Sequence, residues 1–407
     1  MTQPETGLDA PVDGLRKFRF GAGGEGNKDE GGARKFVKLA QTAEEYGYDT
    51  FAVPDHLGNQ VGPIAALGAL TQATSTIRLA TSVLANGWRH PALLAKEANT
   101  IDVLSKGRLE LGIGAGWMKD EFDKAGIEFE SPGVRIRRLD EALTVLDGLM
   151  RGETVDFDGE FYQIKGLEGS PRPRQGPRPP IAVGGGGPKM LALAAKHADV
   201  ISVAPGTTPD GKMKLSDVTI EKTAERVERI RAAAGDRFAD IELNWTIAVI
   251  VITDDRQATA EMALKALDQG YPPNIERDTE FTVDDVLSSP YIAIGSFEEI
   301  ADQIREVPAE DPLAGGVDVG EPAVGVDGVD DIREPGQEVP VVEGRIVVHQ
   351  PRLRQRVCPP RPAGAGTRSG DLPRPPGVSP RSRTRRECES DDTATTPRAP
   401  TTPRKPL

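Results

Sequence analysis

The chain has 407 residues, a formal net charge of −13 and two cysteines, Cys358 and Cys388. This acidic balance excludes a general binder of the nucleic-acid backbone, and the lack of cysteine before residue 358 excludes disulfide scaffolds and cysteine metal sites from the main body. The N-terminus is polar, unlike a signal peptide, and the longest apolar run, at 247–252, is too short to span a bilayer. We therefore expect a cytoplasmic protein with no metal site, no nucleic-acid partner and no membrane partner.

The composition changes sharply after Val307. Residues 308–407 contain no Phe, Tyr or Trp, hold 17 of the 34 prolines and carry 14 arginines against one lysine. Such a segment buries too little apolar surface to offset its chain entropy, so a disordered tail is predicted. One interpretation is a tail that binds acidic partners; the favoured one is sequence read out of frame from a GC-rich gene. Residues 1–16 are expected to be a flexible N-terminus, which leaves 17–307 as the folded domain.

Residues 17–307 alternate short β-like runs with helical patterns. Apolar residues at helical spacing predict helices, of which the clearest are at 33–46, 63–74, 90–104, 134–150 and 296–307. Strands are predicted at 18–20, 49–53, 77–84, 108–114, 181–184, 198–204 and 241–252, and an Asp-Gly within 154–164 predicts a hairpin. Strict alternation of apolar strands with helices is typical of the α/β class, with a parallel sheet covered by helices.

The expected architecture is a TIM (β/α)8 barrel, but seven of its eight strands are evident in the pattern. The eighth should follow Val307, where the composition changes. The later β-like run is at 339–349. The prediction is therefore a barrel whose eighth strand is missing or atypical.

Four groups of residues suited to chemistry follow predicted strands two to five: Asp55-His56, Ser82-Val83, the turn 114–117 and the glycine run 184–187. In a parallel barrel these strand ends meet at one face, where active sites lie. Four glycines before a helix at Pro188 offer backbone N–H groups to a phosphate, and Lys189 adds positive charge. Each motif also has a structural interpretation: a satisfied loop histidine, a tight glycine turn and a flexible glycine loop.

Four segments carry a more specific resemblance: PDHL, LATSVL, RHPALLAKEANTIDVLSKGRLELGIGAGW and PPIAVGGGGPKMLALAAKHAD. In order and spacing they resemble the luciferase-like monooxygenase superfamily over residues 17–306. Within it they resemble most the oxidoreductases that use the deazaflavin coenzyme F420. The resemblance implies a TIM barrel with the cofactor at the C-terminal face of the strands.

The resemblance also implies residue roles. His56 would contact the deazaflavin ring or the substrate's exchangeable proton, as a general base or an electrostatic partner, and Asp55 would orient it or bond to the ring. Ser82-Val83 matches a bulge that carries a non-proline cis peptide and presses on the ring. The implied cofactor-binding residues are Ser82, Val83, Ala115, Gly116, Trp117, Gly184, Gly185, Gly186, Gly187 and Lys189.

Two features depart from this pattern or stay open. The sugar-phosphate dehydrogenases of this branch have an acidic glutamate where this chain has Trp117, so their proton relay is not expected here, and Trp117 suggests an apolar or aromatic wall. Arg89 is interpreted either as a ligand of cofactor carboxylates or as an exposed arginine. The arginines at 135, 137 and 138 are interpreted as a solvated helix face rather than as contacts to an anionic cofactor tail.

The leading hypothesis is an F420-dependent oxidoreductase that transfers hydride to or from a small organic substrate, with a homodimer as one expected assembly. The first alternative keeps the fold but uses FMN and oxygen as a monooxygenase. The second is a non-catalytic barrel, or one crippled by its altered C-terminus.

Overall fold

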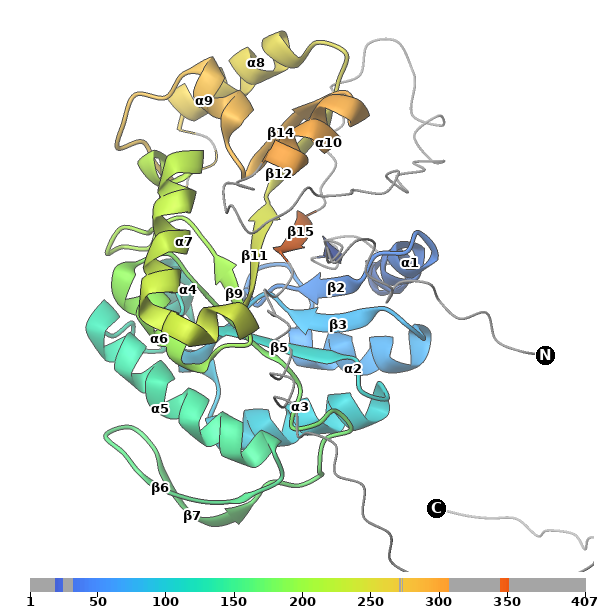
Figure 1. The fold of residues 1–407 in the computed structure, drawn as a ribbon, viewed down its shortest axis with the longest axis vertical. Coiled ribbons are helices and arrows are strands. Elements are labelled where there is room, and N and C mark those ends of the chain that lie inside the picture. Colours follow the sequence, from blue (N-terminus) through green and yellow to red (C-terminus); the bar gives the residue numbers. More distant parts are fainter. Residues whose placement is uncertain (1–18, 25–31, 271, 273, 307–344, 351–407) are drawn as a thin grey trace, which may run out of the picture. The chain divides into compact units, whose positions relative to one another are not determined.

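Seven parallel strands form the centre of the fold in the computed structural model, which describes residues 19–24, 32–270, 272, 274–306 and 345–350 (Figure 1). They are β1 (Arg19–Gly23), β2 (Thr50–Val53), β3 (Arg78–Thr81), β5 (Leu109–Gly114), β8 (Ile181–Gly185), β9 (Val200–Val203) and β11 (Glu242–Ile247). Each pairs in parallel with the next, as the alternation of strands and helices predicts. The predictions for residues 1–16 and for most of 308–407 concern residues outside this described part.

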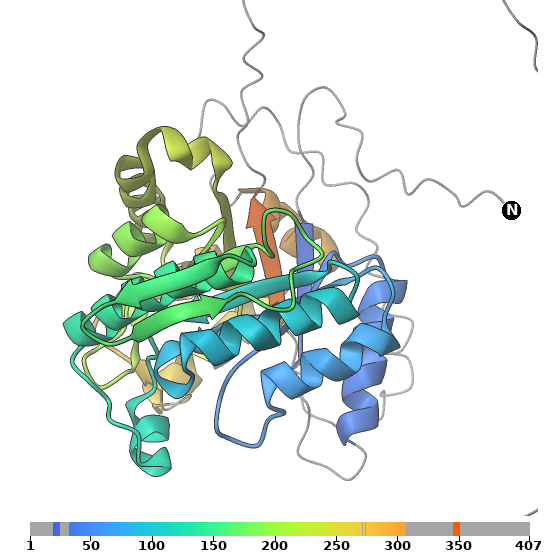
Figure 2. The ribbon, with the colours of Figure 1, turned by 90° about the horizontal axis from the view of Figure 1, so that it is seen from below.

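The strand β15 (Arg345–Gln350) completes the ring and lies beside β1 in Figure 2. It pairs antiparallel with β1 on one side and with β11 on the other. This strand falls within the segment predicted to be disordered, so that prediction is wrong for residues 345–350. The eighth strand is present but atypical, because all eight strands of a TIM barrel are normally parallel.

Helices cover the outside of the ring, except for the short α4 (Lys119–Ala125), which lies at its mouth. The outer helices are α1 (Gly32–Glu45), α2 (Pro63–Ala73), α3 (Pro91–Leu104), α5 (Pro132–Met150), α6 (Pro188–His197) and α7 (Ile220–Ala234). Four of them begin with proline, whose fixed φ suits the first helical turn and whose missing N–H has no partner to lose there. The helix α4 is an addition to the helices named from the sequence.

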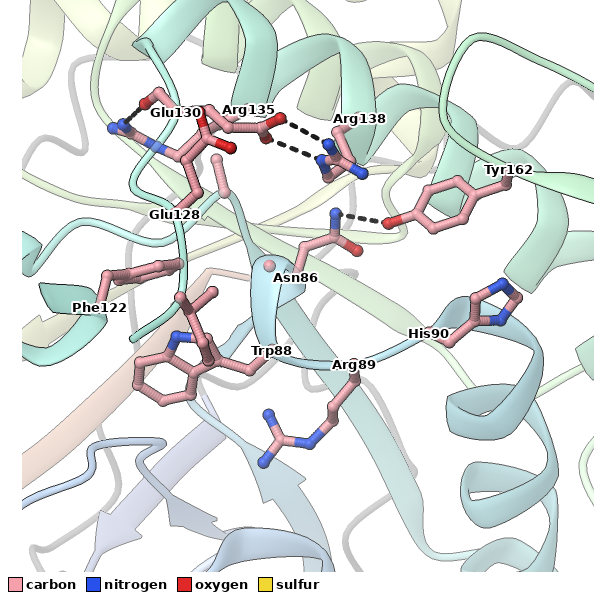
Figure 3. Close-up of a pocket in the computed structure, with 13 residues that line it drawn as sticks. Asn86, Trp88, Arg89, His90, Phe122, Glu128, Glu130, Arg135, Arg138 and Tyr162 are labelled. Atoms are coloured by element: carbon pink, nitrogen blue, oxygen red, sulfur yellow. Dashed lines mark hydrogen bonds and ion pairs between the residues drawn. The ribbon is translucent and has the colours of Figure 1, made fainter. Parts of the chain in front are cut away.

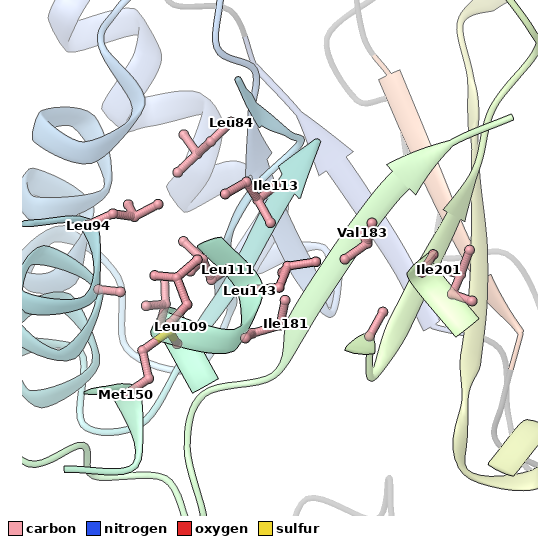
Figure 4. Close-up of a cluster of buried hydrophobic side chains, with 14 of the residues drawn as sticks. Leu84, Leu94, Leu109, Leu111, Ile113, Leu143, Met150, Ile181, Val183 and Ile201 are labelled. Atoms are coloured by element: carbon pink, nitrogen blue, oxygen red, sulfur yellow. The ribbon is translucent and has the colours of Figure 1, made fainter. Parts of the chain in front are cut away.

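The main hydrophobic core lies between the strands and these helices. Leu109, Leu111 and Ile113 alternate along β5 and are fully buried, together with Leu94 of α3 and Leu143 of α5 (Figure 4). Because successive side chains of a strand point to opposite faces, the residues between them face the interior of the barrel. At the mouth end of β5 those interior positions are glycines.

The amino-terminal end of the barrel interior holds an ion-pair network. The Arg19 guanidinium on β1 bonds to Glu110 of β5 at 2.9 Å and to Glu242 of β11 at 2.6 Å, and Arg78 also bonds to Glu110. Burial opposes the charge on Arg19, but the two carboxylates outweigh this effect and raise its pKa. These charges link strands from opposite sides of the ring and leave the other end of the interior for a site.

A second, smaller core packs beside the ring. The single strand expected at 241–252 is divided at Ala248 into β11 and β12 (Val249–Ile252), and β12 pairs in parallel with β14 (Ile292–Gly295). The helices α8 (Arg256–Asp268), α9 (Val283–Ser288) and α10 (Phe297–Glu306) enclose this pair. The remaining elements are β4 (Leu84–Ala85), β6 (Thr154–Asp158), β7 (Gln163–Glu168), β10 (Met213–Lys214), β13 (Ile275–Glu276) and the 3-10 turns η1 (Asn86–Trp88), η2 (Leu215–Asp217) and η3 (Gly235–Asp240).

Candidate active site

The four predicted groups lie along one edge of the barrel. The strands β2, β3, β5 and β8 are consecutive neighbours in the ring and parallel, so the residues that follow them share the carboxyl-terminal face. The strand β4 continues β3 beyond Ser82-Val83, because both pair in parallel with β5. The expected convergence of these groups is therefore a property of the fold.

His56 is held by a residue that sequence interpretation missed. Its Nδ1 lies 3.1 Å from Oε2 of Glu121 on α4, and the side chains are 17% and 12% exposed. The other oxygen of Glu121 accepts the backbone N–H of Leu57 at 3.2 Å. A carboxylate can only accept a hydrogen bond, so this contact places the proton on Nδ1. The Nε2 atom makes no hydrogen bond to any described residue and can exchange a proton.

Asp55 has a different partner from the one expected. Both of its oxygens bond to the Arg89 guanidinium, at 2.5 and 2.8 Å, and one also accepts the backbone N–H of Ala85 at 2.9 Å. Asp55 thus bonds to Arg89 and Ala85 and not to His56, and it ties the end of β2 to the segment after β4; its predicted bond to the cofactor ring stays a prediction. Arg89 is not a plain exposed arginine: its side chain is 23% exposed, and this bidentate pair uses two of its five N–H groups.

The Ser82–Val83 peptide bond is cis, which confirms the expectation from the family resemblance. The Val83 side chain lies over glycines on the neighbouring strands. A Cβ atom added to Gly114 would be 3.1 Å from Val83, one added to Gly184 would be 3.2 Å from it, and one added to Gly112 would collide with the Thr81 carbonyl oxygen. These glycines let the bulge pack closely against the strands, so Gly184 has a packing role.

The turn after β5 combines a strained backbone position with an aromatic wall. Gly116 has φ +82°, which favours glycine, and a Cβ there would collide with the Phe122 ring. The Trp117 ring meets the His56 imidazole edge to face, with centroids 6.0 Å apart. Ala115 and Trp117 are half-buried. The structure thus brings Trp117 and His56 together at the mouth.

The glycine run after β8 leads into α6, as predicted. Gly186 lies so close to the backbone of Ala204 and Pro205 that a Cβ there would collide with it, whereas Gly187 has open space around it. Gly187 is the N-cap of α6, and no side chain caps that helix. Lys189 is exposed in the first turn. Among the residues that the structure describes, neither Lys189 nor Gly185 makes a hydrogen bond to His56.

A cavity of about 380 Å³ lies beside this mouth (Figure 3). Its lining residues come from the segment after β4, from the α4–α5 connection, from α5 and from the hairpin. The principal ones are Asn86, Trp88, His90, Phe122, Arg135 and Tyr162. Ala115 also lines it, so the cavity joins one of the predicted cofactor positions.

The described ranges contain neither a membrane span nor a cluster of metal ligands. No helix there is long and apolar enough to cross a membrane. Among the same residues, no three His, Cys, Asp or Glu side chains are grouped closely enough to bind a metal ion.

Comparison with known proteins settles the family. Residues 17–312 match the sequence profile described as luciferase-like monooxygenase, which is most of the chain. The chain belongs to the luciferase-like monooxygenase family. A solved relative, an F420-dependent secondary alcohol dehydrogenase in complex with an F420-acetone adduct, superimposes with a TM-score of 0.55 at 20% identity, over 72% of this chain and 91% of its own. This similarity supports the luciferase-like barrel.

Curated members of the family differ in cofactor. An F420-dependent glucose-6-phosphate dehydrogenase of Microbacterium testaceum is 31% identical over 47% of this chain and 58% of its own length. One of Mycobacterium avium is 30% identical over 69% of this chain and 81% of its own length. An FMNH2-dependent dimethylsulfone monooxygenase of Pseudomonas putida is 28% identical over 56% and 62%. The chain thus spans less than two thirds of the first of these relatives.

Sequence reasoning missed Glu121 because nothing local marks it. It lies in the charged run KDEFDK, which is typical of a solvated helix, and it is 65 residues from His56 in the chain. The Asp55–Arg89 pair has the same character, with a separation of 34 residues. Their positions in the chain could have indicated both residues, because α4 and Arg89 each follow shortly after a strand that ends at the barrel mouth.

Proposed function

We propose that this luciferase-like protein is an oxidoreductase that uses the deazaflavin coenzyme F420 and transfers hydride to or from a small organic substrate. The proposal includes a cytoplasmic location. The observation that carries it is the His56–Glu121 pair at the barrel mouth, beside Trp117 and in the same face as the Val83 bulge. F420-dependent enzymes among the relatives support the choice of cofactor.

The mouth fits a flat ring. Val83 packs over Gly114 and Gly184, so its side chain presents an apolar surface against which we expect the ring to lie. Ala115 and Trp117 would contact its edge. The backbone N–H groups of residues 185–187 and Lys189 would hold a phosphate at the start of α6. When bound at this position, a deazaflavin supplies a carbon that accepts or donates a hydride.

His56 is the proposed catalytic residue. With its proton on Nδ1 and directed to Glu121, the imidazole has Nε2 available to take the hydroxyl proton of an alcohol that is being oxidised. The carboxylate of Glu121 stabilises the imidazolium that results, in the manner of a base held by an acidic partner. Asp55 and Arg89 act by fixing the loop that carries His56.

The proposed substrate is an alcohol or carbonyl compound of small size. Trp117 stands where the sugar-phosphate dehydrogenases of the family have an acid, and it gives the wall beside His56 an aromatic surface. A phosphorylated sugar that depends on that acid is therefore not the preferred substrate. The substrate for which the glucose-6-phosphate dehydrogenase relatives are named is therefore not proposed for this chain.

A binding titration of the full-length chain with coenzyme F420 and, separately, with FMN tests the cofactor, because each is fluorescent. Tight binding of F420 alone supports hydride transfer. A panel of primary and secondary alcohols, aldehydes and glucose 6-phosphate, followed by the deazaflavin absorbance, then tests the substrate class. Preference for glucose 6-phosphate over every alcohol would contradict the assignment of Trp117.

The alternative function is an FMN-dependent monooxygenase, which the dimethylsulfone monooxygenase relative favours. Tight binding of FMN without F420 would establish it. Binding of neither cofactor would support the third interpretation, a non-catalytic barrel. In that case the antiparallel pairing of β15 with β1 and β11, which departs from the parallel family barrel, would be the first feature to test as the cause.

For the domain arrangement, we infer a barrel of residues 17–307 with β15 added, and a tail beyond it.

A further inference from the structure

The three arginines at the start of α5 divide into two kinds. The Arg137 side chain is 56% exposed and pairs with Glu160, as expected for a solvated helix face. Arg135 and Arg138 instead line the cavity beside the mouth (Figure 3). The Nε and one amino group of Arg138 donate to the two oxygens of the Glu130 carboxylate, at 2.8 and 2.5 Å. Arg135 forms no such ion pair with a described residue.

Arg135 is a half-buried cation without a carboxylate partner among the described residues. Its guanidinium carbon lies 3.8 Å from the centre of the Phe129 ring, and one amino group donates to the Glu130 backbone carbonyl. Its Nε is buried and has no hydrogen-bond partner. Burial lowers the pKa of Arg135, and attraction from Glu130 only partly opposes this effect. A buried charge that lacks a counter-ion is costly, so an anion at this place would be stabilised.

The rest of the cavity suits an organic body attached to that anion. Trp88, Phe122 and Ile127 form an apolar side, and Asn86 and Tyr162 a polar side, linked by a hydrogen bond of 3.4 Å. The Trp88 Nε1 is buried and has no partner among the described residues, so it is a second unused donor. A volume of about 380 Å³ admits a single small ring with its substituent.

Two of the other cations that line the cavity are paired with carboxylates of the chain. Arg89 is bound to Asp55, and Arg138 to Glu130. Glu128 is exposed at the rim. Among the described residues that line the cavity, the cation without a carboxylate partner is therefore Arg135, and the Trp88 indole N–H is an unused donor in the same lining.

We propose that this cavity is a binding subsite for the carboxylate or phosphate of an organic ligand, with Arg135 as the counter-ion and Trp88 as a second donor. Two sources share this chemistry: an anionic substrate with an aromatic or apolar body, and the anionic tail of the cofactor. The second source rests on the proposed function, and the first does not.

Calorimetric titration of the full-length chain with benzoate, phenyl phosphate and neutral benzyl alcohol tests the first source. We expect at least one anion to bind about tenfold or more tightly than the alcohol, because charge-assisted hydrogen bonds are the strong ones. Arg135→Met should remove this preference. Arg137→Met, on the same helix but exposed and paired with Glu160, should keep it. If Arg135→Met melts at a much lower temperature, Arg135→Lys replaces it and should retain part of the preference.

A second arm compares coenzyme F420 with the same deazaflavin lacking its phosphate and carboxylates. If the advantage of F420 falls about tenfold or more in Arg135→Met and not in Arg137→Met, the anion is the cofactor tail. Loss of the preference for benzoate or phenyl phosphate alone assigns the subsite to a substrate. If Arg135→Met changes neither preference, or if no anion is preferred at all, the subsite does not exist. Failure of F420 to bind leaves the first arm intact, so the two proposals fail separately.

Discussion

Replacement of Glu121 by glutamine is the sharpest test of the proposed site. The carboxylate makes one hydrogen bond of 3.1 Å to His56 Nδ1, and both side chains are mostly buried, with 12% and 17% exposed. A charge-assisted hydrogen bond of this kind contributes about 1.5–3 kcal/mol. If that energy stabilises the imidazolium in the transition state, its loss lowers turnover about 10- to 150-fold. Glutamine has the shape of glutamate and still accepts the Leu57 N–H, so the fold should stay intact.

The assay is steady-state turnover, followed by deazaflavin absorbance, with a substrate from the alcohol and aldehyde panel. Thermal melting is measured in parallel. Asp120→Asn is the matched control, because Asp120 is the preceding residue of α4 but is exposed and pairs with Lys124. Unchanged turnover in Glu121→Gln, with turnover abolished in His56→Ala, would refute the role of Glu121. If Glu121→Gln lowers the melting temperature as much as a substitution in the hydrophobic core does, the main role of Glu121 is to stabilise the fold.

Three further predictions test the site and the fold. His56→Ala should lower turnover by about 10²-fold or more while the melting temperature changes little; unchanged turnover would refute the catalytic assignment. Glu44 accepts the N–H groups of residues 75–77. Burial opposes its ionisation, but these bonds outweigh burial and lower its pKa. Its charge therefore stabilises the fold above the unfolded-state pKa of about 4.3, and this contribution is lost as the pH falls through the lower folded-state pKa. Glu44→Gln should thus cost about 1–2 kcal/mol in denaturant unfolding at pH 7, and this cost should shrink as the pH is lowered below about 4; a cost independent of pH would contradict this. Deletion of residues 345–407 should expose the edges of β1 and β11 and lower the melting temperature; an unchanged melt would show that β15 adds no stability.

Much of the fold follows from local pattern. Apolar runs such as Leu109–Gly114, separated by amphipathic helices, indicate a parallel sheet, since both faces of each strand are buried. Strand order then places the ends of β2, β3, β5 and β8 on one face, which brings His56 and Trp117 into the same region. Strand periodicity does not indicate that the strand at 241–252 breaks at Ala248 and that β12 leaves the ring.

The partners of the site residues could not be obtained in this way. Adjacent residues Asp55 and His56 look like a pair in the sequence, yet their side chains bond to Arg89 and Glu121. Successive residues at a strand end point in different directions, so neighbours in sequence are poor guides to neighbours in space. On a helix, residues two positions apart also point in different directions, so Arg135 and Arg137 of α5 have different surroundings.

The sequence by itself determined the class of this protein: a parallel barrel of the luciferase-like family, with its chemistry at the carboxyl ends of the strands. The barrel follows from the spacing of apolar residues and from strand order, whereas the family follows from the resemblance of motifs such as PDHL and LATSVL. The tertiary structure alone decided that Glu121 holds His56, that β15 closes the ring antiparallel, and that Arg135 lines a cavity with no carboxylate partner among the described residues. Each of these depends on how segments distant in sequence pack, and local periodicity contains no information about that.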